Sequence, residues 1–160
     1  MNFGPRNDVS RHESYEQTYE GNFAVPGKIF IADDVAQLRT LYSAILKLHG
    51  YDVILVASSG EEVVKLARDG GLKEVEIAIF DYSMGAVNGL EAAVETVKSN
   101  PRIRIIIGSA NEEIATQASV LGFAFLKKPF SKDELLGLLS SIEQDIRESR
   151  YYARQSSAFQ

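Results

Sequence analysis

From Lys28 onward, short apolar runs alternate with longer segments in which apolar residues recur every three or four positions. The runs predict buried strands, and the periodic segments predict helices with one apolar face. The predicted strands are 28–32, 53–57, 77–80, 103–108 and 123–127. The predicted helices are 35–49, 59–69, 88–99, 112–121, and one that begins at 131 and ends between Glu148 and Ala153.

The sequence also contains residues that typically begin and end helices. Capping pairs precede three helices: Ser59 with Glu62, Asn88 with Glu91, and Ser131 with Glu134. Helix stops follow at Gly50, at Gly70-Gly71 and at Asn100-Pro101.

The strands are rich in Ile, Val and Phe and lack polar alternation, which is typical of a parallel sheet covered by helices on both faces. We therefore predict an α/β fold, a doubly wound five-stranded sheet of order 2-1-3-4-5 flanked by five helices. In such a sheet ligands bind at the carboxyl edge of the strands.

The chain divides into one domain and two flanking segments. We expect a flexible arm at 1–26, a domain at 27–150 and a tail at 151–160. Within the arm, Tyr15, Tyr19 and Phe23 recur at a spacing of four, which favours one face of a short helix; a disordered arm is the alternative.

The composition of the chain argues against several classes of function. A net charge of −5 argues against direct nucleic-acid binding. The absence of cysteine excludes disulfides and thiol chemistry. No apolar stretch is long enough to span a membrane, and the first 20 residues do not resemble a secretory signal, so we expect a cytoplasmic protein.

Acidic side chains follow two strands that are neighbours in this topology. Asp33 and Asp34 end the first strand and Asp81 ends the third, so their three carboxylates should converge. Their mutual repulsion would be relieved by a divalent cation, and all-oxygen ligands favour Mg²⁺. The alternative is that Asp33 and Asp34 only cap the following helix.

Two further polar residues end strands at the same edge. Lys128 follows the fifth strand, and its ammonium would point at the acids and hold a phosphoryl oxygen. Ser109 closes the fourth strand, and its hydroxyl would donate to the same group. The alternatives are a solvated lysine and a serine that only forms a turn. A carboxylate such as Asp81 forms an acyl phosphate without a general base.

Other sites find little support. His12 and His49 are isolated and lack acidic neighbours at ligand spacing, and no glycine-rich phosphate-binding loop is present.

Together these residues resemble the receiver domain of two-component response regulators, over residues 28 to about 148. The matching stretches are KIFIADD, DYSMGAVNGLE, IIIGSA and FLKKPF. The resemblance implies the flavodoxin-like receiver fold, with Asp81 as the phosphoacceptor. It implies that Asp34 ligates Mg²⁺ directly, that Asp33 does so partly through water, and that Asp81 and the Ser83 backbone carbonyl complete the protein ligands.

The resemblance also implies a conformational switch. Ser109 matches the family's hydroxyl and Lys128 its lysine, with a cis bond between Lys128 and Pro129. Phe125 matches the aromatic residue that swings inward when Ser109 is drawn toward the phosphoryl group. The chain departs from the family in three ways: Gly85 stands where proline is usual, the segment from Gly122 to Lys128 is one residue short, and the switch residue is Phe rather than Tyr.

We therefore expect a stand-alone response regulator in two-component phosphorelay signalling, a phosphoprotein rather than an enzyme. Its partners would be a sensor histidine kinase or histidine phosphotransfer protein and a downstream protein target that reads helix four, strand five and helix five. A homodimer through the last helix or the aromatic arm is compatible with this. The alternatives are a phosphorylation-independent docking module and a phosphatase of the haloacid dehalogenase type, which the lack of a second acid near Asp81 disfavours.

Overall fold

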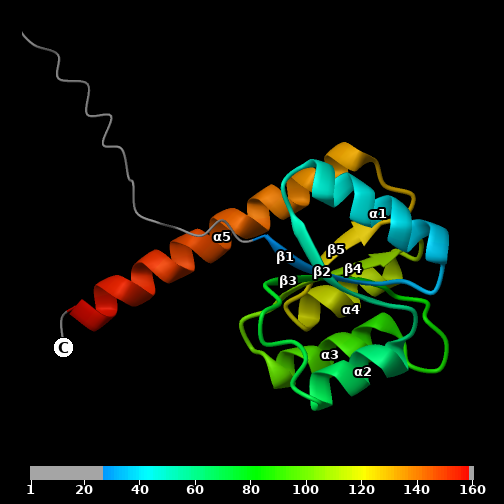
Figure 1. The fold of residues 1–160 in the computed structure, drawn as a ribbon, viewed down its shortest axis with the longest axis horizontal. Helices are drawn as coiled ribbons and strands as arrows, with labels where there is room; N and C mark the ends of the chain where they lie inside the picture. The colour runs from blue at the N-terminus through cyan, green and yellow to red at the C-terminus, as the bar shows by residue number, and fades with distance from the viewer. Residues whose placement is uncertain (1–26, 159–160) are drawn as a thin grey trace, which may run out of the picture.

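The computed structural model describes residues 27–158, and the predicted arm at 1–26 lies outside them. Strands and helices alternate throughout (Figure 1). The strands are β1 (Lys28–Ala32), β2 (Asp52–Ala57), β3 (Ile77–Asp81), β4 (Arg104–Ser109) and β5 (Ala124–Lys127). The helices are α1 (Ala36–Leu48), α2 (Gly60–Arg68), α3 (Gly89–Ser99), α4 (Glu113–Val120) and α5 (Lys132–Ala158).

The five strands form one parallel sheet of order β2-β1-β3-β4-β5, which confirms the predicted topology. In the register, Ala32 lies beside Phe80, Asp81 beside Gly108, and Ser109 beside Lys127. The ends of β1, β3, β4 and β5 therefore meet at one edge of the sheet, where the sequence places its acids, its serine and its lysine.

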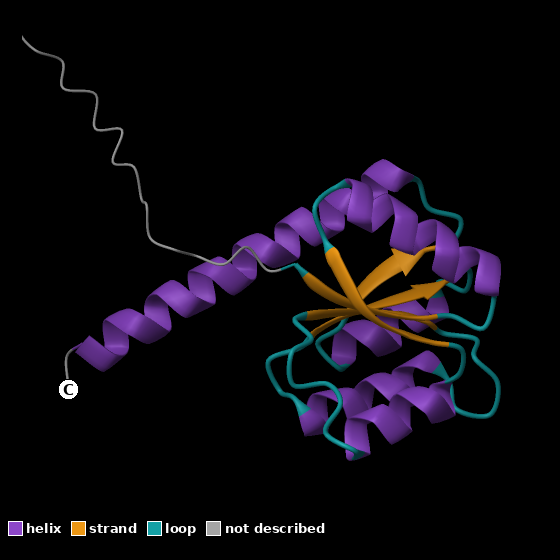
Figure 2. Cartoon of the chain, viewed as in Figure 1, coloured by secondary structure: helices purple, strands orange, loops and turns teal. Residues whose placement is uncertain are grey.

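Helices cover both faces of the sheet (Figure 2). On one face α1 and α5 pack on the sheet: Leu46 of α1 and Leu135 and Leu139 of α5 belong to one apolar cluster with strand residues such as Ile31 and Ile79. On the other face α2, α3 and α4 pack in a second cluster. Each strand contributes side chains to both clusters, which explains why the strands read as continuous apolar runs.

Two of the three predicted capping boxes form completely. Asn88 and Glu91 exchange side-chain and backbone hydrogen bonds at the start of α3, and Ser131 and Glu134 do the same before α5. At α2, Ser59 accepts from the Glu62 amide, but the Glu62 carboxylate accepts from Ser58 instead. Local sequence therefore sets these helix starts, as predicted.

The prediction that the last helix ends between Glu148 and Ala153 is wrong, because α5 continues to Ala158. Its last residue buried against the sheet is Ile146, and every side chain from 147 to 158 is exposed. Arg150 still reaches Glu76 across 2.9 Å, and beyond it the helix extends away from the sheet (Figure 1). None of the helices in residues 27–158 combines the length and apolar character that a membrane span requires.

Candidate phosphoacceptor site

Three carboxylates converge at the carboxyl edge of β1 and β3. Asp33 and Asp34 follow β1, Asp81 is the last residue of β3, and one carboxylate oxygen of each lies within 4.8 Å of the others. Asp33 is buried, Asp81 is half-buried and Asp34 is exposed. The predicted convergence is therefore present, with one member of the cluster open to solvent.

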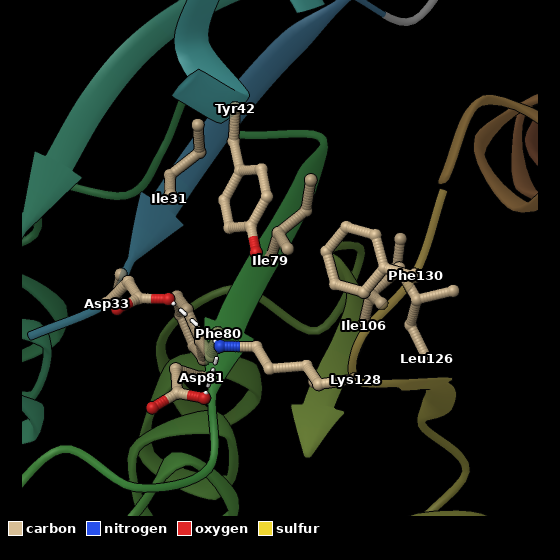
Figure 3. Close-up of a pocket in the computed structure, with 12 residues that line it drawn as sticks. Ile31, Asp33, Tyr42, Ile79, Phe80, Asp81, Ile106, Leu126, Lys128 and Phe130 are labelled. Atoms are coloured by element: carbon tan, nitrogen blue, oxygen red, sulfur yellow. Dashed lines mark hydrogen bonds and ion pairs between the residues drawn. The ribbon is translucent and has the colours of Figure 1, made fainter. Parts of the chain in front are cut away.

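Lys128 reaches this cluster from the end of β5. Its Nζ donates to Asp81 Oδ1 at 2.7 Å and to Asp33 Oδ2 at 3.1 Å (Figure 3). Its backbone N–H donates to the carbonyl of Ser109, which extends the β4–β5 pairing to the site. The bond between Lys128 and Pro129 is cis. The lysine thus faces the acids rather than solvent, with a side chain that is 21% exposed.

The cluster holds more negative charge than one ammonium neutralises. Burial, and then the carboxylates of Asp33 and Asp34, raise the pKa of Asp81 against the opposing effect of Lys128. For Lys128, burial is the largest effect and lowers the pKa, but contacts with Asp81 and Asp33 outweigh it, so that the pKa is raised. Lys128 therefore stays charged, and the ionised form of Asp81 is disfavoured.

Asp33 has a second, local function. Its Oδ1 accepts the Val35 N–H at 2.9 Å, and its backbone carbonyl accepts from Arg39 Nη1 at 2.6 Å. The N-cap of α1 is Val35, which makes no side-chain capping bond. Asp33 therefore helps to order the turn before α1 while its other carboxylate oxygen faces Lys128, so that capping alone does not account for it.

The remaining predicted site residues lie nearby. Ser109 is buried at the end of β4, and its Oγ accepts the Asn111 N–H at 3.1 Å, as in the turn-forming alternative. Phe125 is half-buried in β5 and packs against the cluster under α2, α3 and α4. Ser83 is exposed in the loop after β3. The roles assigned to these three residues stay predictions.

Gly85, in the same loop, has a φ of +92°. A proline, whose φ is held near −65°, cannot adopt this conformation. The loop at Gly85 therefore has a backbone conformation that a proline at this position could not adopt.

The sequence did not single out the residues that surround Lys128. Tyr42 of α1 and Phe130, just after β5, stack with ring centroids 5.2 Å apart. Together with Gly108 they line a cavity that also contains Asp33, Asp81 and Lys128. In the sequence, Tyr42 is one of the apolar positions that recur every three or four residues along the predicted helix 35–49. Its hydroxyl among apolar neighbours was the one signal that could have set it apart.

The donor set fits a hard divalent cation. All three candidate side chains are carboxylates, they lie within reach of one ion, and Asp34 is open to solvent so that water ligands can complete the coordination. Burial is the main cause of the raised pKa of Asp81, and the charges of Asp33 and Asp34 raise it further; a bound cation would relieve this repulsion among the carboxylates. The acidic cluster is thus able to hold a metal ion.

Comparison with known proteins decides the family. The response regulator receiver domain family matches residues 29–140 of this chain. The chain belongs to the response regulator receiver family. Members are typically phosphoacceptor signalling domains of two-component systems, and the acidic triad is typical of their phosphoacceptor site.

Similar curated proteins support this assignment. The chain is 29% identical over 120 residues to the chemotaxis protein CheY of Thermotoga maritima. The aligned region covers 73% of this chain and 98% of that CheY. It is also 29% identical over 133 residues to the transcriptional regulatory protein PdtaR of Mycobacterium tuberculosis, which covers 82% of this chain. The chain spans only 63% of the length of PdtaR.

Solved structures agree on the fold. A CheX–CheY complex with BeF₃ and Mg²⁺ from Borrelia burgdorferi is similar with a TM-score of 0.66 and 23% identity, over 74% of this chain and 90% of that one. A CheY-like receiver from Methanospirillum hungatei is similar with a TM-score of 0.68 and 20% identity, over 77% and 98%. At these identities the likeness establishes the fold.

Proposed function

We propose that this protein is a response regulator receiver that accepts a phosphoryl group on Asp81. The observation that carries the proposal is the contact of Lys128 Nζ with both Asp81 and Asp33 inside a cluster of three carboxylates. This arrangement brings three things together at one edge of the sheet: the Asp81 carboxylate as nucleophile, the Lys128 ammonium, which can bind the incoming phosphoryl group, and a set of carboxylates that can ligate a metal ion. Membership in the receiver family supports the same assignment.

The reaction follows from the positions of these groups. An Asp81 carboxylate oxygen attacks the phosphorus of a phosphorylated donor, the donor's P–O or P–N bond breaks, and the electron pair leaves with the donor. Lys128 turns its ammonium from Asp81 to an oxygen of the incoming phosphoryl group. Ser109 at the end of β4 donates its hydroxyl to another oxygen of that group.

A magnesium ion would be held by Asp33, Asp34 and Asp81, with the Ser83 carbonyl as a further ligand. When bound, it supplies positive charge next to the phosphoryl oxygens. This assignment rests on the carboxylate cluster and its excess negative charge. The CheY of Borrelia burgdorferi, whose structure contains Mg²⁺ and BeF₃, supports it as a relative of the same fold.

The partners follow from the chemistry of the family. We infer a sensor histidine kinase or a histidine phosphotransfer protein as the donor, and a protein target or a further relay step as the output. The surface read by the target would comprise α4, β5 and α5, with Ser109 and Phe125 linking it to Asp81. Val120 and Leu121 at the end of α4 are exposed apolar residues that suit such a contact.

The signalling unit would be residues 27–150, and its chemistry would be confined to its own phosphorylation and dephosphorylation. The target must distinguish the two states, because a partner with equal affinity for both shifts no equilibrium.

The proposal is tested by incubating the protein with acetyl phosphate and Mg²⁺ and measuring its intact mass. We expect the wild type to gain one phosphoryl group and Asp81→Asn to gain none. Asp133→Asn, which removes an exposed carboxylate from the first turn of α5, is the matched control and should label as the wild type does. Equal labelling of Asp81→Asn would refute Asp81 as the acceptor.

If the wild-type protein stays unlabelled with both acetyl phosphate and a phosphorylated histidine donor, the alternative function is favoured. In that case the receiver fold serves as a phosphorylation-independent docking module. The absence of an amide shift at Ser109 and Phe125 upon addition of beryllofluoride and Mg²⁺ would point the same way.

A further inference from the structure

A groove rich in lysine and arginine lies at the amino edge of the sheet, whereas Asp81 lies at the carboxyl edge. The start of β1, the segments before β3 and β4, and the second half of α5 form this groove, and its volume is about 600 Å³. The charged residues that line it are six cations and two acids: Lys28, Lys73, Arg102, Arg104, Arg150, Arg154, Glu74 and Glu76. The groove therefore carries net positive charge on a chain whose net charge is −5.

The acids of the groove do not neutralise all of its cations. Lys73 and Arg102 are exposed and form no ion pair with any residue within 27–158. Both charges are therefore available to an anionic ligand. The two acids are already paired within the groove, as Lys28–Glu74 at 2.8 Å and Arg150–Glu76 at 2.9 Å.

Apolar side chains also line the groove. Val75 and Ile146 are buried core residues that border it, and Pro101 and Ala153 are exposed. A ligand that combines carboxylates with apolar rings matches this mixed lining better than a nucleic-acid backbone, which offers phosphates alone. We therefore looked for an acidic polypeptide segment with aromatic residues.

The chain itself contains a segment of this kind directly before the described residues. Residues 12–27 contain no Lys or Arg, and acids alternate with aromatic residues among them: Glu13, Tyr15, Glu16, Tyr19, Glu20 and Phe23. On a helix, spacings of three and four would place the three acids along one face and the three rings along the adjoining face. This acidic–aromatic segment, residues 13–23, complements both the charged and the apolar lining of the groove.

The described part of the chain begins at the groove, which brings the segment close to it. The Gly27 N–H donates to Glu76 Oε2 at 2.7 Å, and Lys28 lines the groove. Three residues separate Phe23 from Gly27, and an extended chain spans at most about 3.3–3.6 Å per residue. Such a short connection keeps the effective concentration of the segment at the groove on the order of millimolar, so that weak contacts suffice for docking.

We propose that residues 13–23 dock in the groove of the same chain, with their glutamates facing Lys73 and Arg102 and their aromatic rings on the apolar lining. The docked segment covers the part of α5 around Arg150 and excludes other proteins from it. This inference does not rest on the proposed function, because the groove and Asp81 lie at opposite edges of the sheet.

The test uses the full chain with one nitroxide spin label, which the absence of cysteine makes straightforward. The label is attached at Ser14→Cys, a position on the helix face opposite the acids and rings. Amide spectra then measure the paramagnetic broadening at Lys73, Arg102 and Ser149, which line the groove. Lys73→Glu/Arg102→Glu reverses the two unpaired charges, and Lys132→Glu, at an exposed lysine where α5 begins, is the matched control.

We expect the groove variant to lower the ratio of docked to free segment about two- to fivefold for each reversed charge, as for the loss of an exposed ion pair, and to reduce the broadening accordingly. Lys132→Glu should leave the broadening unchanged. Glu16→Lys/Glu20→Lys should reduce it as well, and because these residues lie outside the domain at 27–150, unfolding of the domain cannot explain that loss. Combining the groove variant with Glu16→Lys/Glu20→Lys should restore the broadening.

Equal broadening in wild type and in both charge-reversed variants would overturn the proposal, and so would a combined variant that restores nothing. A mixture of spin-labelled chains with unlabelled, isotope-enriched chains identifies the donor of the segment. We expect no broadening in the enriched chains. Broadening there would mean that the groove binds the segment of a second copy, which contradicts docking within one chain.

Discussion

At the residue scale, the carboxylate of Asp81 lies in surroundings that disfavour its ionised form. The side chain is 10% exposed, two further carboxylates lie beside it, and within residues 27–158 Lys128 is the cation that opposes them. The raised pKa of Asp81 means that its negative charge costs stability in the folded state. A carboxylate with a raised pKa beside a specific charge partner in a pocket marks a candidate functional residue.

This cost has a defined pH dependence. Because the folded state binds the Asp81 proton more tightly than the unfolded state does, the cost is absent below the ordinary carboxyl pKa of about 4. It grows as the pH rises through the raised pKa of the folded state. In metal-free buffer we therefore expect Asp81→Asn to melt a few degrees above wild type at neutral pH.

Thermal melting of both proteins across a pH series checks this expectation. The difference in melting temperature should shrink toward zero in acid, and millimolar Mg²⁺ should reduce it at neutral pH. A difference that stays constant, or that widens in acid, would mean that the Asp81 charge is not the cause.

A metal ion bound at the proposed site would compete with Lys128 for the carboxylates of Asp33 and Asp81. Lys128→Ala should therefore bind Mg²⁺ at least as tightly as wild type but show none of the beryllofluoride-induced amide shifts at Ser109 and Phe125. Amide spectra with and without the two ligands measure both effects. Lys127→Ala, which removes the exposed neighbour that pairs with Glu112, is the control. Lost Mg²⁺ affinity in Lys128→Ala would contradict the role given to the lysine.

At the residue scale, the sequence located the charged groups but not their surroundings. Asp33, Asp34, Asp81 and Lys128 each follow or end an apolar run, so that strand topology alone brings them together. Tyr42 reaches the same site from the middle of α1. Its direction depends on how the helix packs on the sheet, which periodicity does not specify.

At the scale of elements, strands and helix starts were more predictable than helix ends. Continuous runs of Ile, Val and Phe marked the strands, and side-chain caps marked α3 and α5. The end of α5 was missed because its apolar stripe stops at Ile146 while the helix does not. The residues that follow include Arg, Glu, Gln and Ala, which propagate a helix, and contain neither Gly nor Pro to end it.

The exposed end of α5 should therefore add helix without adding much stability. A chain ending at Arg150, which keeps the ion pair with Glu76, should unfold within about 0.5 kcal/mol of the full chain. It should lose part of the helical circular dichroism signal. By comparison, Leu139→Ala, at a fully buried position of the same helix, should cost about 2–5 kcal/mol.

Urea unfolding followed by circular dichroism provides both values. A large loss of stability upon truncation would mean that the domain extends past residue 150 and that our proposed boundary is wrong.

At the scale of the whole molecule, the predicted sheet topology is confirmed. It explains why the acids, the serine and the lysine meet in a single site at the carboxyl edge of the sheet. In the order β2-β1-β3-β4-β5, the ends of β1 and β3 are neighbours, and β4 and β5 follow on one side. Four strand ends can thus deliver Asp33, Asp81, Ser109 and Lys128 to one edge. The sequence pattern predicted the alternation of strands and helices, whereas the strand order came from the known orders of doubly wound sheets, because strand order depends on long-range packing that no local pattern encodes.

The central claim is that Asp81 is the phosphoryl acceptor of this site. It is tested most directly by treating the phosphorylated protein with hydroxylamine, which converts an acyl phosphate to a stable hydroxamate, and locating the altered residue by peptide mass spectrometry. We predict a single hydroxamate, at Asp81. A hydroxamate at Asp33, Asp34 or a carboxylate outside the cluster, with Asp81 unchanged, would contradict the account.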